Sequence, residues 1–341
     1  MDKKHLDNLD LLRGIAALAV VLFHFSNSTL PTIKPNPLGP LFSWGDLGVQ
    51  VFFVISGFVI PFAMYQGGYT ITNAGRFIAK RMVRLGPPSW LAMGLIVAIY
   101  YAALWKNGNP IEGMDWPGMN AQSVLGNMFY TFDIGNIKPF YSVLWTLEVE
   151  LQYYLIIAFV FPLLINARTS TVHYILLLSL LSASYFLYLD QVIFFKFNSL
   201  FVMGIWAFLY LIRRIDRNYF ILGGFAAILV CTIQLNIPSA IAGGLTMFAI
   251  IFVKTKNRYA KFLGGISYSL YITHHFSGIS AEFAAKWLLG GSYDATGKIL
   301  MLFLFTTIAI IFAYLFYRLV EQPFIRLAGL IRFKQENKSG R

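Results

Sequence analysis

The chain has 341 residues, of which 57% are hydrophobic, 17% aromatic and only 12% charged. Because a soluble globular domain carries about a quarter charged residues, this composition excludes that class and predicts an integral membrane protein. The formal net charge of +12 is typical of basic cytoplasmic loops between membrane helices, and we expect no nucleic-acid partner. The single cysteine, Cys231, excludes an intramolecular disulfide.

The first apolar segment, 9–28, contains two ionisable residues, Arg13 and His24. An ionisable group at membrane depth costs on the order of several kcal/mol, so it rarely occurs without a partner or a function. Their spacing is close to three helical turns, which places both on nearly the same face, about 16 Å apart. Asp10 shares that face with Arg13. Alternatively, Arg13 extends to the lipid headgroups and His24 hydrogen-bonds a neighbouring helix.

Windows of about twenty apolar residues predict ten membrane spans and an all-α bundle. Basic residues concentrate in alternate connections, so the positive-inside rule predicts that both termini are cytoplasmic. The pattern indicates one membrane domain over 1–341, with no internal repeat and no appended soluble domain. The predicted spans are 9–28, 47–66, 87–105, 142–165, 172–189, 193–212, 218–235, 238–254, 262–287 and 298–322.

Two connections stand out for their composition. The segments 30–46 and 106–141 are both predicted to face outward. Each is expected either to bind a polar ligand or to cover the helix ends. The cytoplasmic connection after the second span contains Arg81 and Arg84, one helical turn apart and therefore on one face. Such a pair either serves only as a topology signal or binds a diphosphate.

The fourth span begins with two carboxylates, Glu148 and Glu150. Residues two positions apart on a helix point away from each other, so only one can face a given site. A buried Glu150 needs a proton or a cationic partner, and His24 is a candidate for that partner. Such a pair would fix the imidazole tautomer and raise its basicity, as general-base catalysis requires. A purely structural salt bridge is the alternative.

The last two spans add further ionisable residues. His274 and His275 are adjacent and point in different directions, so at most one is expected to join a site. Neither has a partner at the spacing that a metal site prefers, and we predict no metal site. Glu321 is expected near the cytoplasmic surface, level with Arg13, and Pro323 is expected to end the helix.

Six ordered motifs across 9–323 give the chain a specific resemblance. It resembles the acyltransferase-3 family of membrane O-acyltransferases that modify bacterial polysaccharides. The chain departs from the family pattern at three positions. Gln50 stands where an acidic residue is common, Ser89 replaces an aromatic residue, and Phe276 replaces a proline. The motifs are LDLLRG followed by His24, GVxxFFxxSGF (48–58), RxxR before Pro87, WTLxVExQYY (145–154), ISYSLYxxH (266–274) and YxxxExP (317–323).

The resemblance implies about ten helices, cytoplasmic termini, an acyl-CoA donor and an essential first-helix histidine, His24. The family's arginine pair is thought to engage the donor, which here implies Arg81 and Arg84. We therefore expect acyl-CoA, with acetyl as the acyl group, to bind from the cytoplasm as a substrate with no permanently bound cofactor. The expected location is the bacterial cytoplasmic membrane.

In the mechanism we expect, the donor phosphates contact Arg81, Arg84 and Arg13, and the thioester lies near His24. His24, oriented by Glu150, deprotonates a hydroxyl of a carbohydrate acceptor. A ping-pong route through an acyl-histidine is the alternative. Oxyanion donors and other substrate-binding residues are expected among Trp145, Tyr153, Asp10, His274 and Glu321.

Two other functions fit intramembrane His, Glu and Arg residues. A proton-coupled transporter or flippase carries such residues, although it often has two pseudo-symmetric halves, which this sequence lacks. The second alternative function is a catalytically inactive scaffold, which the presence of Arg13, His24 and Glu150 disfavours.

Overall fold

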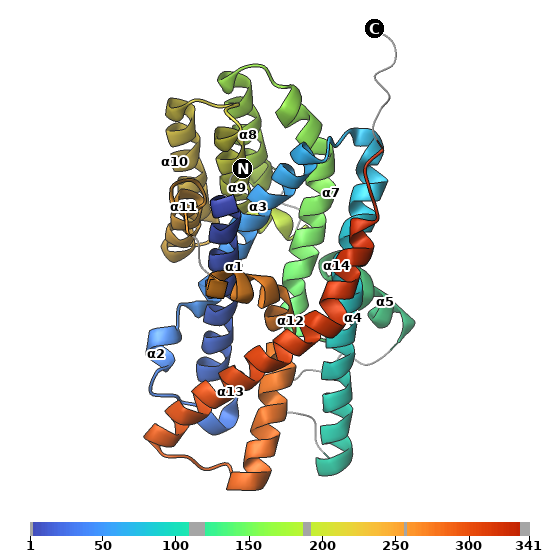
Figure 1. Cartoon of the computed structure of the whole chain (residues 1–341), viewed down its shortest axis with the longest axis vertical. Helices are drawn as coiled ribbons and strands as arrows, with labels where there is room; N and C mark the ends of the chain where they lie inside the picture. The colour runs from blue at the N-terminus through green and yellow to red at the C-terminus, as the bar shows by residue number, and fades with distance from the viewer. Residues whose placement is uncertain (1–2, 109–119, 187–191, 256–257, 335–341) are drawn as a thin grey trace. The chain divides into compact units, whose positions relative to one another are not determined.

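The computed structural model describes residues 3–108, 120–186, 192–255 and 258–334, and within them the chain is helical with no β-strand (Figure 1). The long helices are α1 (Lys3–Asn27), α3 (Gly48–Gln66), α4 (Ala74–Asn107), α7 (Trp145–Asn166), α8 (Ser170–Phe186), α9 (Phe194–Leu211), α10 (Arg217–Gln234), α11 (Ile237–Phe252), α12 (Arg258–Leu289) and α13 (Ala295–Phe316). Shorter helices are α2 (Gly39–Phe42), α5 (Ala121–Phe129), α6 (Phe132–Gly135) and α14 (Gln322–Gly329), and a π-helical turn (Tyr317–Glu321) joins α13 to α14.

The predicted all-α membrane class is confirmed in its coarse form. Each predicted span falls on a helix among the described residues, and seven helical stretches are long and apolar enough to cross a membrane. The helices α8 and α11 are shorter apolar helices, and α12 does not reach the same apolarity. The count of ten crossings and the cytoplasmic termini stay predictions. The end of the fifth predicted span, 187–189, and the basic tail 335–341 lie outside the described residues.

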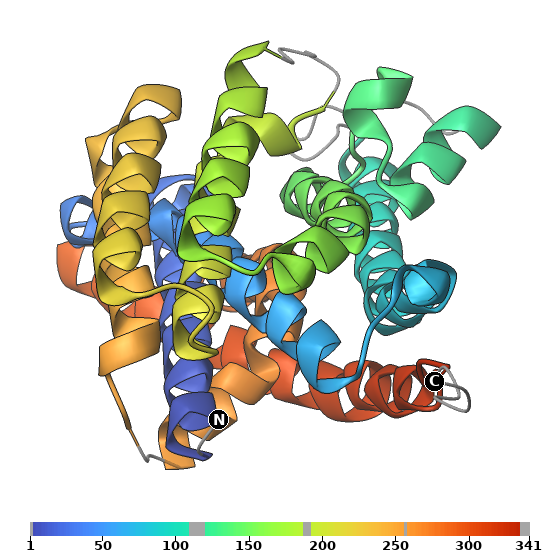
Figure 2. The ribbon, with the colours of Figure 1, turned by 90° about the horizontal axis from the view of Figure 1, so that it is seen from above.

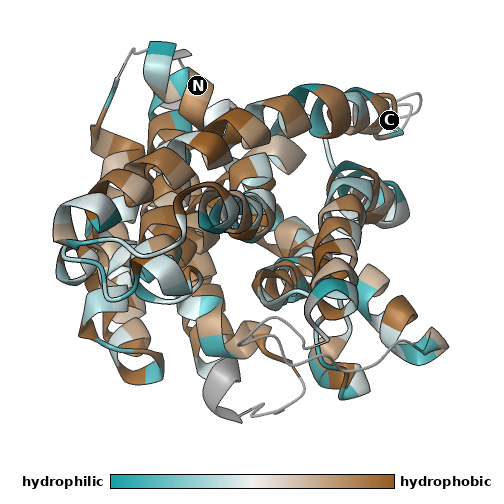
Figure 3. Cartoon of the chain, turned by 90° about the horizontal axis from the view of Figure 1, so that it is seen from below, coloured by the Kyte–Doolittle hydropathy of each residue, from teal (hydrophilic) through white to brown (hydrophobic). Residues whose placement is uncertain are grey.

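Large apolar side chains remain exposed along several helices. Phe225 on α10 is 67% exposed, Phe248 on α11 is 54% exposed and Leu300 on α13 is 60% exposed. Hydrophobic residues predominate along the helices, as the brown ribbon in Figure 3 shows. Exposed apolar surface on this scale is unfavourable in water but is the expected surface of a helix in lipid.

The chain divides into two compact units, each assembled from separated parts of the sequence. The first unit comprises Met1–Phe52, Gly86–Thr146 and Lys254–Pro323. The second comprises Phe53–Leu85, Leu147–Val253 and Phe324–Arg341. The helices α3, α4 and α7 each contribute residues to both units.

In the first unit, α1 packs along α12 (Figure 1). A Cβ added to Gly264 would lie 2.4 Å from the carbonyl oxygen of Asp10, so the two backbones touch near the start of both helices. Towards the other end, a Cβ on Gly278 would lie 2.5 Å from the ring of Phe25. The two helices therefore run in the same direction.

The segment 30–46 packs against the C-terminal part of α12. The Glu282 carboxylate accepts hydrogen bonds from the backbone N–H of Thr32 at 2.7 Å and from its hydroxyl at 2.6 Å. Asn36 donates to the carbonyl oxygen of Lys298 at the start of α13. This connection therefore covers the ends of helices in its unit, which was one of its two predicted roles.

In the second unit, α9 packs against α3, and α8 to α11 lie beside one another (green to yellow in Figure 2). A Cβ on Gly57 would lie 2.1 Å from the carbonyl oxygen of Phe201, and one on Gly204 would lie 2.1 Å from that of Val54. Gly57 and Gly204 allow this close helix approach, since only residues without a side chain let these backbones touch.

The sequence prediction was wrong about where one helix begins. The segment 76–84 was expected to be a connection before a helix starting near Pro87, but α4 is continuous from Ala74 to Asn107. Pro87 and Pro88 lie inside it, although proline lacks the amide donor of a helical turn. The Ser89 hydroxyl donates to the carbonyl oxygen of Gly86 at 2.8 Å. Arg81 and Arg84 therefore lie on the same helix as the third span.

The contact between α3 and α9 gives a stability prediction. Gly204→Ala should destabilise the protein by about 1–3 kcal/mol because the added methyl group has no space between the backbones. The matched control is Gly94→Ala on α4, where a Cβ meets no atom within 4 Å. Thermal unfolding of the purified proteins in detergent measures both. Equal melting temperatures for the two variants would contradict this packing.

Candidate functional site

Three histidines from two helices of the first unit form one cluster, which we call the three-histidine cluster: His24, His274 and His275. The His24 ring centroid lies 5.1 Å from that of His274 and 4.7 Å from that of His275. One ring nitrogen from each residue lies within 4.8 Å of the other two. His274 is fully buried and His275 is 9% exposed.

The prediction that at most one of His274 and His275 joins a site was wrong. Adjacent side chains on a helix diverge by about 100°, but a third ring between them can contact both. The parallel packing of α1 on α12 places His24 in that position. Neither histidine has a partner at that spacing on its own helix, but His24 contacts both from another helix. Sequence spacing detects only partners on the same helix, and His24 lies 250 residues away along the chain.

Hydrogen bonds fix the orientation of two of these rings. The Nδ1 atom of His274 lies 2.7 Å from the carbonyl oxygen of Tyr271; because a carbonyl can only accept, this Nδ1 carries the proton. The Nδ1 atom of His24 lies 3.0 Å from the hydroxyl of Ser28, which itself donates to the carbonyl oxygen of His24 at 3.3 Å. We therefore assign the Nδ1–H tautomer to both residues. Each then has a free lone pair on Nε2.

The residues just before α7 also lie at this cluster. The Tyr141 ring centroid is 5.5 Å from that of His275. The Thr146 hydroxyl donates to the Tyr271 hydroxyl at 3.1 Å. Trp145, predicted to bind substrate, is the half-buried first residue of α7, between these two contacts in sequence. The predicted motif 145–154 thus begins next to α12 in the first unit.

At the other end of α1, Asp10 interacts electrostatically with Arg13 and with Lys261 of α12. The predicted association of Asp10 with Arg13 on one face is therefore present. Glu321 is buried and accepts a hydrogen bond of 2.6 Å from the Ser269 hydroxyl. Ser269 lies on α12 between Gly264, which contacts Asp10, and His274. The helix α12 thus carries polar residues along its length between these two groups.

Glu150 lies in a second polar group, within the second unit. Its Oε1 atom accepts hydrogen bonds from the Tyr154 hydroxyl at 2.5 Å and the Ser56 hydroxyl at 3.2 Å. The Arg81 guanidinium interacts electrostatically with Glu150 and stacks 5.6 Å from the ring centroids of Tyr154 and Phe77. The half-buried carboxylate therefore has a cationic neighbour.

The arginine pair retains unused donors in this unit. The Nε atoms of Arg81 and Arg84 are buried and have no hydrogen-bond partner among the described residues. A buried donor left without a partner costs about 1–3 kcal/mol, more for a charged group. Unsatisfied guanidinium groups are suited to a phosphate or another anion. The Tyr153 hydroxyl, 3.4 Å from the carbonyl oxygen of Gly57, contacts the backbone beside the same group.

The predicted pairing of His24 with Glu150 joins residues from different units, and it stays a prediction. Within its own unit His24 bonds Ser28, and within its own unit Glu150 bonds Tyr154. The sequence contains a signal for both contacts, because each partner lies four residues further along the chain, a spacing of about one helical turn. Ser56 had no such signal: no acid lies near it in sequence, and only the packing of helices brings it to Glu150.

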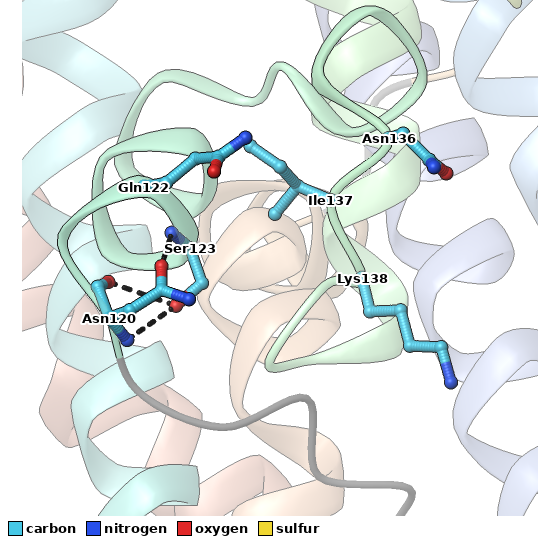
Figure 4. Close-up of a pocket in the computed structure, with 6 residues that line it drawn as sticks. All are labelled: Asn120, Gln122, Ser123, Asn136, Ile137 and Lys138. Atoms are coloured by element: carbon cyan, nitrogen blue, oxygen red, sulfur yellow. Dashed lines mark hydrogen bonds between the residues drawn. The ribbon is translucent and has the colours of Figure 1, made fainter.

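A polar hollow of about 290 Å³ lies in the predicted outward segment 106–141 (Figure 4). Asn120 and Ser123 hydrogen-bond each other there in a capping box at the start of α5. Amide and ammonium groups in an open hollow can hydrogen-bond a polyhydroxylated ligand. The acids Glu112 and Asp115 of this segment lie outside the described residues. The hollow is lined by Asn120, Gln122, Ser123, Asn136, Ile137 and Lys138.

The fold and the site together define a multi-pass membrane protein with buried imidazole, carboxylate and guanidinium groups. The chain belongs to the acyltransferase-3 family, since the family model, described as an acyltransferase domain, matches residues 6–318. The predicted resemblance is therefore confirmed.

Three relatives illustrate the similarity. The chain is 32% identical to exopolysaccharide production protein ExoZ of Rhizobium meliloti (strain 1021) over 142 residues, which cover 40% of this chain and 38% of that protein. It is 26% identical to peptidoglycan O-acetyltransferase OatA of Listeria monocytogenes over 165 residues, which cover 45% of this chain and 24% of the relative. It is 25% identical to a Staphylococcus aureus (strain COL) protein provisionally named an O-acetyltransferase, over 94% of this chain and 57% of the relative. The chain thus spans between a quarter and three fifths of these relatives. No solved structure matches it.

The Glu150 group gives a second stability prediction. Tyr154→Phe should destabilise the protein by about 1.5–3 kcal/mol, because it removes a short hydrogen bond to a carboxylate. The matched control is Tyr153→Phe, which removes only a 3.4 Å contact with a neutral carbonyl and should cost less. Thermal unfolding in detergent compares the two. A larger loss for Tyr153→Phe would contradict the assigned bonding.

Proposed function

We propose that this protein is a membrane O-acyltransferase that moves an acyl group, most simply acetyl, from acyl-CoA to a hydroxyl of a carbohydrate. Its location would be the bacterial cytoplasmic membrane. The family match over 6–318 supports the reaction class. The names of the relatives ExoZ and OatA, which refer to exopolysaccharide and peptidoglycan, support an envelope carbohydrate as acceptor.

The observation that carries the mechanism is the 3.0 Å contact between His24 Nδ1 and the Ser28 hydroxyl. With the proton on Nδ1, as we assign it, the Nε2 lone pair of His24 is free. In the proposed reaction, Nε2 accepts the proton of the acceptor hydroxyl, and the alkoxide oxygen attacks the thioester carbonyl carbon. A C–O bond forms, the C–S bond breaks, and the imidazolium returns its proton to the leaving thiolate. A positioned base of this kind contributes about 10²–10⁴-fold to the rate.

Glu150 would orient His24 and stabilise the imidazolium when the acceptor is bound. The developing oxyanion requires hydrogen-bond donors, and Trp145 and Tyr153 supply an indole N–H and a phenol O–H. The Tyr153 hydroxyl makes only a long contact in this state, so it is free to turn to a better acceptor.

The acyl-CoA donor would approach from the cytoplasm. Its phosphates would contact Arg81, Arg84 and Arg13. The unpartnered Nε donors of the arginine pair support this role. The carbohydrate would enter from the opposite side, past the polar hollow at Asn120 and Lys138. Asp10, His274 and Glu321 would contact the two substrates along α1 and α12.

Replacing the proposed base tests the reaction. His24→Ala should lower the rate of acyl transfer at least about a hundredfold, because no other group replaces the lost base. Ser28→Ala should lower it less, because the imidazole stays but loses its orientation. Both variants should elute from size-exclusion chromatography like the wild type. Full activity of folded His24→Ala would exclude this mechanism.

Replacing the arginine pair tests the donor site. Arg81→Ala and Arg84→Ala should each weaken binding of a non-hydrolysable acyl-CoA analogue about tenfold or more, as expected for a charge-assisted hydrogen bond. The control is Arg76→Ala, an exposed arginine of the same helix, which should leave the affinity unchanged. Isothermal titration calorimetry measures all three. If Arg81→Ala and Arg84→Ala both bind like the wild type, the pair is only a topology signal.

A further inference from the structure

The three-histidine cluster contains more hydrogen-bond acceptors than donors. With Nδ1–H directed to Tyr271 and to Ser28, the Nε2 atoms of His274 and His24 are acceptors. The Nε2 atoms of His274 and His275 are buried and have no hydrogen-bond partner among the described residues. A buried polar atom left unsatisfied costs about 1–3 kcal/mol, and two such atoms lie here beside a third imidazole.

A positive centre between the rings would satisfy these lone pairs together. We propose that the three-histidine cluster binds one transition-metal ion of the Zn²⁺ type. Imidazole nitrogen is a preferred ligand for Zn²⁺, and three histidines with one open position form a known zinc donor set. The site lacks the carboxylate and carbonyl oxygens that Ca²⁺ or Mg²⁺ would require among its proposed ligands.

The geometry is close to that of a metal site. Three atoms within 4.8 Å of one another share a central point at most about 2.8 Å from each. Zn–N bonds are about 2.0–2.1 Å long, so each nitrogen would move inward by less than about 1 Å. Small rotations of the side chains accomplish this, and the half-buried His24 leaves one side of the site open for a fourth ligand such as water.

The surrounding hydrogen bonds also fit a metal site. A metal-binding histidine almost always donates its other ring N–H to a carbonyl, a carboxylate or water, which fixes the ring and raises its basicity. His274 donates to the Tyr271 carbonyl in this way, and His24 is held by Ser28. His173 differs: both of its ring nitrogens contact backbone carbonyl oxygens at 2.8 Å, so neither is available to a metal.

A bound ion has a consequence that rests on the proposed function. An ion on His24 occupies the lone pair that would accept the proton of the acceptor hydroxyl. Metal binding and acyl transfer are then mutually exclusive, and Zn²⁺ inhibits the enzyme at the concentrations at which it binds the cluster. A chelator restores activity.

Metal binding is measured without reference to activity. Purified full-length protein in detergent is dialysed against Zn²⁺, and bound zinc is counted by mass spectrometry; Co²⁺ replaces Zn²⁺ for absorption spectra. We expect one ion per chain, with the visible bands of a nitrogen-coordinated Co²⁺ site. His274→Gln and His275→Gln should each weaken binding at least about tenfold, and the control His173→Gln should leave it unchanged.

The outcomes separate this inference from the proposed function. The metal site is overturned if the protein binds no stoichiometric Zn²⁺, or if His274→Gln and His275→Gln both bind Zn²⁺ like the wild type. Neither outcome bears on the proposed acyl transfer, which is assayed separately in the wild type with chelator present. Stoichiometric binding that is lost in both variants supports the site. If Zn²⁺ saturates the cluster while acyl transfer continues at the same rate, the inhibition is wrong and so is the role of His24 as base.

Discussion

The close parallel packing of α1 on α12 is the constraint on which the first unit depends. It requires glycine at position 264, where any side chain would overlap the backbone of Asp10, and at position 14, where a Cβ would lie 2.6 Å from that of Leu263. Because the helices run together in the same direction, the polar residues of one meet those of the other at corresponding heights. Asp10 meets the start of α12, and His24 meets His274 and His275.

The second unit contains the interaction of Glu150 with Arg81. A carboxylate and a guanidinium shielded from water are each costly, and Glu150 and Arg81 offset that cost for one another. Tyr154 and Ser56 each donate a hydrogen bond to one oxygen of that carboxylate. Within the part of the chain that the structure describes, the Nε donors of Arg81 and Arg84 have no partner, so this group is better suited to bind an anion than to serve only as a structural salt bridge.

The family's motifs are distributed between these two environments. The histidine of the first motif and the residues of the fifth lie in the first unit, whereas the RxxR arginines and the glutamate of the fourth motif lie in the second. In the reaction we propose, a base and a donor-binding group belong to separately packed bodies. The continuous helices α3, α4 and α7, which contribute to both, provide the covalent connection.

Composition and hydrophobic periodicity determined the membrane class and the helical segments, and they singled out the ionisable residues within apolar helices. Apolar length and a rare charge within an apolar run are local properties of a sequence. The contact of His24 with Ser28 and that of Glu150 with Tyr154 were also readable, since both follow the four-residue helical spacing. Only the tertiary structure decided that both His274 and His275 contact His24, that Ser56 reaches Glu150, and that α4 continues through Pro87. These contacts join residues far apart in the chain or depend on a helix tolerating prolines, and neither spacing nor propensity encodes which surfaces pack together.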